Sequence, residues 1–125
     1  MTTTSISSAS GGRTSRSQFL QGVFSFAGQG LEHPAPLDPS LTYVVPQDRE
    51  AQLVYFRGGN ASEELVSVMI MRDGEPMRIF PIGAKASTHV PLRVVEDLLA
   101  ETRIEVFLAS EGSGKVVLDI GLVEV

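Results

Sequence analysis

The stretch ELVSVMIMRDGEPMRIFPI, residues 64–82, decides the fold class. Apolar residues alternate with other residues before an Asp73-Gly74 pair, and this dipeptide between two apolar runs is typical of a hairpin turn. Period-two alternation places successive side chains on opposite faces of a strand. The stretch therefore predicts two antiparallel strands joined by a tight turn. The buried face of the first strand carries Val66, Val68 and Ile70.

The same alternation recurs along the chain, where turn residues interrupt it at short intervals. Seven strand candidates result, at residues 41–45, 52–57, 64–72, 77–82, 87–94, 102–109 and 115–125. Residues 94–101 give the only plausible helical turn. Seven short strands with frequent turns are typical of an antiparallel β-sandwich of immunoglobulin-like type, although the Cys and Trp marks of antibody domains are absent. We expect an all-β sandwich that resembles small immunoglobulin-like accessory proteins, with a small barrel as the alternative.

The last predicted strand is the most apolar one. Its inward stripe consists of Val116, Leu118, Ile120 and Leu122. A terminal strand with so continuous an apolar face is expected to pair within a sheet rather than fray.

Composition and charge narrow the functional classes. A chain of 125 residues corresponds to one domain with a core of its own. The net charge of −5 argues against binding to the phosphates of nucleic acids. The absence of cysteine removes disulfides and thiolate metal sites. No apolar run approaches the roughly 18 to 20 residues that span a bilayer. We therefore expect a soluble protein whose partner is a protein or a small molecule.

The N-terminal third differs in composition from the rest of the chain. Ser, Thr and Gly dominate residues 1–17, which leaves too little apolar surface to offset the entropy of ordering them. Several prolines then favour an extended linker. We expect a flexible or leader-like arm over residues 1–39 and a sandwich domain over residues 40–125.

Part of this arm, SRSQFLQ at residues 15–21, resembles the twin-arginine export leader pattern Ser-Arg-Arg-x-Phe-Leu-Lys. Ser17 stands in place of the second arginine, and Gln21 stands in place of the lysine. The matching residues are Ser15, Arg16, Phe19 and Leu20. The resemblance implies an exported protein, of a class in which cofactor-containing redox enzymes and their small companion subunits are common. Because the arginine pair that defines the pattern is broken, we favour a cytoplasmic protein whose Ser/Thr-rich arm docks on a partner through its FLQGVFSF motif, with export as the alternative.

Catalytic side chains are scarce. His33 lies in the proline-rich linker and His89 lies in a predicted strand, so neither accompanies the nucleophile and orienting acid of a serine-type triad. Carboxylates such as Glu96 and Asp97 are adjacent in sequence, and on an extended strand they would point to opposite faces. We therefore expect a non-catalytic protein without a cofactor.

One set of residues is compatible with a metal. Met69 and Met71 share a strand face, Met77 follows the hairpin turn, and His89 lies further along the chain. Thioethers combined with an imidazole are ligands that Cu(I) prefers. The set loosely resembles the methionine and histidine sites of small exported copper carriers. A copper-binding carrier is therefore the alternative function.

The hairpin also predicts a protein-binding surface. Pro76 and Pro81 interrupt its second strand, which is typical of a sheet edge because proline cannot donate to a strand ladder. The predicted partner-binding residues are Met69, Met71 and Phe80 beside this edge, with Phe19, Phe24 and Phe26 of the arm. The sequence thus favours a non-catalytic accessory or binding module that docks on a protein, and the leader-like segment makes an exported redox enzyme a candidate partner. The oligomeric state stays open.

Overall fold

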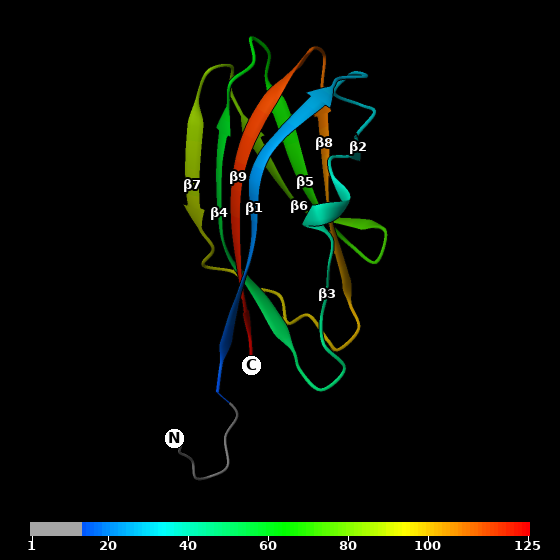
Figure 1. Cartoon of the computed structure of the whole chain (residues 1–125), viewed down its shortest axis with the longest axis vertical. Helices are drawn as coiled ribbons and strands as arrows, with labels where there is room; N and C mark the ends of the chain where they lie inside the picture. Colours follow the sequence, from blue (N-terminus) through cyan, green and yellow to red (C-terminus); the bar gives the residue numbers. More distant parts are fainter. Residues whose placement is uncertain (1–13) are drawn as a thin grey trace.

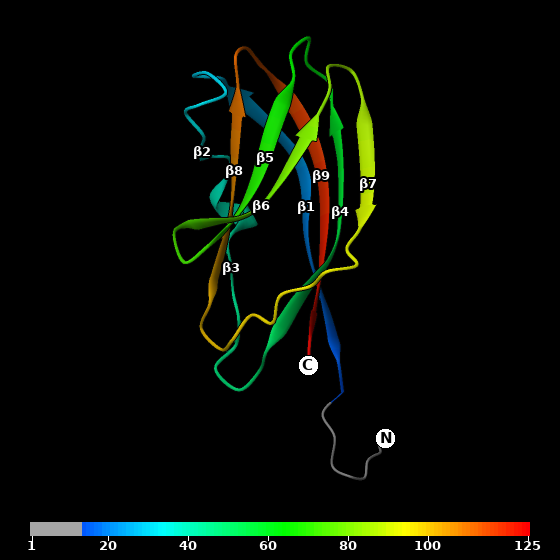
Figure 2. The same cartoon turned by 180° about the vertical axis from the view of Figure 1, so that it is seen from behind.

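The computed structural model describes residues 14–125, which fold into two antiparallel β-sheets packed face to face (Figure 1). Sheet A has the strand order β1-β9-β4-β7. Sheet B, seen from behind in Figure 2, has the order β2-β8-β5-β6, and β3 also pairs with β8. The strands are β1 (Arg16–Ala27), β2 (Ala35–Pro36), β3 (Tyr43–Val44), β4 (Ala51–Asn60), β5 (Val66–Arg72), β6 (Glu75–Ile82), β7 (Ser87–Pro91), β8 (Arg103–Ser110) and β9 (Ser113–Glu124). A 3₁₀ turn, η2 (Pro39–Leu41), precedes β3.

The chain crosses repeatedly between the two sheets. Sheet A contains β1, β4, β7 and β9, and sheet B contains the strands between them in sequence. This order is that of a double-sheet jelly roll. The predicted all-β antiparallel sandwich is confirmed. Immunoglobulin domains share the two-layer architecture but connect their strands in a different order.

The predicted hairpin forms β5 and β6. Its two-residue turn places Asp73 at φ 50° and Gly74 at φ 85°, and positive φ at both central residues is what a type I′ turn requires. β6 lies at the edge of sheet B, as its two prolines predicted.

The core fills the space between the sheets. The inward stripes predicted for β5 and β9 are buried in it. The ring of Phe56 from sheet A stacks on the ring of Phe80 from sheet B, with centroids 4.1 Å apart and planes inclined by 3°. This aromatic pair joins the two layers directly.

The expectation of an arm is wrong for Arg16–Ala27, because these residues form β1 and pair with β9 over their whole length. Leu20 and Phe24 turn inward and are buried. A Cβ on Gly22 would lie 2.7 Å from the Phe24 ring, so the glycine makes room for this aromatic anchor. Local composition could not reveal β1, since its partner strand lies at the other end of the chain. Of the expected arm, residues 1–13 lie outside the described residues.

The expected linker is also part of the domain. Asp38 caps η2, with its Oδ1 accepting a hydrogen bond of 2.9 Å from the backbone amide of Ser40, and Leu41 is buried. The helical turn expected at residues 94–101 does not form. Instead, Leu98 is buried there and makes an isolated β-bridge with Ala51. Among residues 14–125 there is no helix long and apolar enough to cross a membrane.

Candidate functional site

Four polar side chains cross the outer face of sheet A, one from each strand. Strand pairing places Gln21 of β1 opposite Asp119 of β9. It also places Arg57 of β4 opposite both Asp119 and His89 of β7. Each of these residues alternates with inward-facing neighbours, so its side chain points away from the core. We call these four residues the polar row.

Asp119 is the centre of the polar row. Its Oδ1 accepts hydrogen bonds from the Tyr55 hydroxyl at 2.8 Å and from Nε2 of Gln21 at 3.1 Å. Its Oδ2 lies 3.5 Å from Nη1 of Arg57. These contacts hold the carboxylate in place while the guanidinium of Arg57 remains exposed to solvent.

The Tyr55 ring lies against Gly121, its cross-strand neighbour. A Cβ on Gly121 would stand 2.1 Å from Cε2 of this ring, so only glycine leaves space for it. Burial raises the pKa of Tyr55, and the hydrogen bond to Asp119 raises it further. The hydroxyl therefore stays protonated, as a donor, at neutral pH. His89 meets the ring edge-on, with the centroids 6.2 Å apart.

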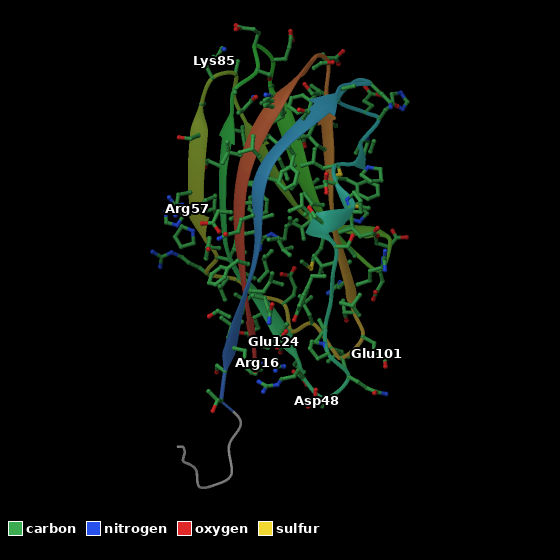
Figure 3. All side chains as sticks on the ribbon, in the orientation of Figure 1. Arg16, Asp48, Arg57, Lys85, Glu101 and Glu124 are labelled. Atoms are coloured by element: carbon green, nitrogen blue, oxygen red, sulfur yellow. The ribbon has the colours of Figure 1, made fainter. Side chains whose placement is uncertain are left out.

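A hollow of about 390 Å³ adjoins the polar row. Its lining includes Arg57, Gly59, Ser87, His89, Val117 and Asp119. The hollow exists because Gly59 lies between Val117 and Ser87 in the sheet and has no side chain to fill the space. A Cβ added to Gly59 would have its nearest heavy atom 4.0 Å away. Figure 3 shows Arg57 on the β4–β7 side of the sandwich, away from Arg16 and Glu124.

The six predicted partner-binding residues do not form one surface. Phe19 is exposed on the outer face of sheet A, and Met69 is half-buried on the outer face of sheet B. The buried members are Phe24, Met71 and Phe80, and Phe26 packs partly against the core.

For Phe80, the physical reason is strand register. Phe80 stands opposite Val68, so both side chains face the core. The pairing of β5 with β8 continues through Met71 without a shift and sets Met71 opposite Glu105 on the outer face of sheet B. Met71 therefore lies on the predicted face, but it is buried there by its neighbours.

The four candidate copper ligands also lie apart. His89 belongs to the polar row of sheet A, whereas Met69 lies on the outer face of sheet B. Met71 is buried, and Met77 packs against the core from β6. Over residues 14–125, no group of three or more His, Cys, Asp or Glu side chains is placed to hold a metal ion.

Met69 belongs instead to a second row, across the outer face of sheet B. Strand pairing places it between Ile79 of β6 and Phe107 of β8. Phe107 in turn stands opposite Pro36 of β2. We call these four residues the apolar row.

The leader-like residues 15–21 lie at the start of β1. Arg16 forms an ion pair of 2.8 Å with Glu124, and Leu20 is buried. Export by this segment stays a prediction. A fusion of residues 1–39 to a reporter tests it, and retention in the cytoplasm that Ser17→Arg does not change would contradict it.

Apart from His89, the members of the polar row were not predicted as site residues from the sequence. A signal was present, because alternation marks every member as outward-facing and Asp119 is the one carboxylate on the outward face of β9. The register that aligns the four residues depends on pairing between distant strands, which local sequence does not encode.

No protein-family model matches this chain. No curated protein matches it significantly in sequence. Solved structures share the fold. The CBM36-1 domain of a multidomain xylanase from the hindgut metagenome of Trinervitermes trinervoides has a TM-score of 0.51 and 12% identity, with 88% of this chain and 97% of that domain covered.

Two structures of infectious bursal disease virus are also similar. The T13 viral particle has a TM-score of 0.50 and 11% identity, with 89% of this chain and 31% of that chain covered. The VP2 subviral particle has a TM-score of 0.50 and 8% identity, with 89% of this chain and 32% of that chain covered. Likenesses at these identities show the fold alone.

Proposed function

We propose that this chain is a non-catalytic binding module that holds a carbohydrate on the outer face of sheet A. The observation that carries the proposal is the polar row beside the hollow of about 390 Å³. Neighbouring strands are spaced by about 4.8 Å, so the row presents its polar groups at regular intervals. Sugar hydroxyls both donate and accept hydrogen bonds, and an amide, a carboxylate, a guanidinium and an imidazole supply both kinds of partner.

The charges of the site favour an uncharged ligand. Arg57 and Asp119 lie within ion-pair distance and offset one another, so neither an anion nor a cation is preferred. The exposed Val117 and the ring of His89 give apolar surfaces on which the C–H face of a sugar ring can pack.

Two further observations support a binding role. The oxygens of Asp119 are engaged by Tyr55, Gln21 and Arg57, which disfavours the use of this carboxylate as a general base. The fold is also shared with the CBM36-1 domain, a carbohydrate-binding β-sandwich.

Calorimetric titration with a panel of soluble neutral polysaccharides tests the proposal. The wild-type chain should bind at least one of them, and Arg57→Ala should weaken that binding by about tenfold or more, which is about 1.4 kcal/mol. Arg103→Ala is the matched control, because Arg103 has a similar side-chain exposure (54% against 58%) and also pairs with a carboxylate, but lies on sheet B. Absence of binding to the whole panel, or equal losses in the two arginine variants, would overturn the proposal.

The apolar row favours a second candidate function, docking on a protein partner. The solvated face of an antiparallel sheet normally carries polar residues, whereas Phe107, Met69 and Ile79 are consecutive apolar positions across sheet B. Met69→Glu should abolish binding to such a partner while the far-UV circular dichroism stays unchanged. Ser67→Glu, on the same face of β5, is the control. An exported redox enzyme is a candidate for this partner only if the leader-like segment directs export.

A further inference from the structure

The outer edge of β1 differs from the outer edges of β2, β6 and β7. β1 pairs with β9 on one side, and no strand among the described residues pairs with its other side. The edge strands β2, β6 and β7 carry prolines, which discourage pairing with another chain; these are Pro36, Pro76, Pro81 and Pro91. β1 has no proline, and no charged residue after Arg16. This edge therefore lacks the prolines and charges that protect a sheet edge against strand addition.

Every second residue of β1 directs its backbone groups to this edge. The amide of Gly28, directly after β1, donates a hydrogen bond of 3.0 Å to the carbonyl of Gly112, and the register with β9 continues through β1 without a shift. Residues that bond to the neighbouring strand alternate with residues that bond away from it. The residues of β1 that bond away from β9 are therefore Ser17, Phe19, Gln21, Val23, Ser25 and Ala27.

We propose that β1 pairs antiparallel with β1 of a second copy of this chain, about a twofold axis at Gln21. With the axis at Gln21, the ladder between the two copies includes nearly the whole strand, from Arg16 to Phe26. It sets Phe19 opposite Val23 of the second copy, and these side chains are 54% and 65% exposed in one chain. Cross-strand apolar pairs of this kind stabilise a sheet.

The strand can pair with itself without charge repulsion, and its inner-face side chains are complementary in size. In the proposed register Arg16 stands opposite Phe26 of the second copy, so the two arginines lie at opposite ends of the ladder. On the inner face, Leu20 stands opposite Gly22 of the second copy, which pairs a large residue with the smallest. No like charges oppose one another in this register. Two identical β1 strands can therefore pair at this edge.

The pairing would join sheet A of both copies into one continuous sheet. Its twofold axis is perpendicular to that sheet, so the two polar rows face the same way and could bind one polysaccharide together. This consequence rests on the proposed function, whereas the pairing itself does not.

Sedimentation velocity of the full chain over a wide concentration range tests the pairing. At high concentration the mass should reach twice the 13.4 kDa of one chain. Val23→Lys should shift the chain to monomer, because it replaces an apolar edge contact with a charge. Val117→Lys is the matched control, since Val117 pairs with Val23 on the same face but belongs to β9, which has a strand on each side. Val23→Pro should also give monomer, because it removes an amide donor from the open edge without touching the bonds to β9.

A wild-type chain that stays monomeric at every concentration, or a Val23→Lys variant that dimerises like wild type, would overturn the pairing. Recruitment of another protein by a chain that does not self-associate would also overturn it. Dimerisation without polysaccharide binding would leave the pairing standing and overturn the proposed function alone.

Discussion

The hydroxyl of Tyr43 donates a hydrogen bond of 2.5 Å to Glu124, whose exposed fraction is 1%. The other carboxylate oxygen of Glu124 lies 2.8 Å from Nη2 of Arg16 and 3.0 Å from its Nε. Figure 3 shows Arg16 and Glu124 close together at the end of the sandwich where β1 begins. Because an unpaired buried charge is costly, these partners are what permits a carboxylate at this position. The contacts tie β1 and β9 of sheet A to β3 of sheet B.

Glu124→Ala should lower the free energy of unfolding by about 2 to 3 kcal/mol, because it removes charged hydrogen bonds that join the two sheets. Urea denaturation measures the change. Glu63→Ala is the control, since Glu63 pairs with Lys85 at 3.0 Å but has an 82% exposed side chain. Its effect should stay below about 0.5 kcal/mol, as for other surface ion pairs. Equal losses in the two variants would refute the role of Glu124.

The stability of the protein should fall as the pH rises above about 10, the pKa of an ordinary tyrosine. Burial raises the pKa of Tyr43, and the hydrogen bond to Glu124 and its negative charge raise it further; the pKa of Tyr55 is raised as well. Both groups stay neutral in the folded chain at a pH where the unfolded chain ionises. They therefore contribute stability below the unfolded pKa of about 10 that is progressively lost above it.

The phenolate absorbance follows this ionisation, because the chain has two tyrosines and no tryptophan. At about pH 10.5, the absorbance should be small for the folded protein and rise when urea unfolds it. In Tyr43→Phe, the alkaline decline of the urea midpoint should be shallower. A folded protein that already shows full phenolate absorbance at that pH would contradict the raised pKa values.

Gly121→Ala should lower the free energy of unfolding by about 1 to 3 kcal/mol, because its Cβ would displace the Tyr55 ring. The near-UV circular dichroism of tyrosine should change with it. Gly59→Ala is the matched variant, since its Cβ would enter the hollow with no atom closer than 4.0 Å. It should leave the unfolding free energy within about 0.5 kcal/mol and weaken polysaccharide binding. The two variants thus distinguish a glycine that the packing of Tyr55 requires from a glycine that the ligand site requires.

Phe80→Ala should lower the free energy of unfolding by about 3 to 5 kcal/mol, because it removes the ring that stacks on Phe56 between the sheets. Ile79 is the neighbouring residue on β6 but is 54% exposed, so Ile79→Ala should change the stability by about 0.5 kcal/mol or less. Thermal unfolding of both variants measures the difference. A Phe80→Ala variant as stable as wild type would restore Phe80 as a candidate surface residue.

The sequence by itself determined the β-strands and most of the core. Period-two alternation is a local property, so it identified the inward stripes of β5 and β9 without knowledge of their neighbours. The Asp73-Gly74 turn was equally predictable, because the positive φ angles it requires depend on these two residues alone. The prolines of β6 also predicted its position at a sheet edge, because a proline has no amide hydrogen to donate to a neighbouring strand.

Only the tertiary structure decided which strands meet. Arg16 and Glu124 are separated by 108 positions in the sequence, and their pairing makes β1 a strand of the sheet instead of an arm. The polar row and the inward position of Phe80 likewise follow from register between strands. Register is set by hydrogen bonds and packing across the whole domain, and a shift of one residue would turn each side chain to the other face. Local sequence therefore marks which residues alternate, and the assembled sheets decide which of them lie together.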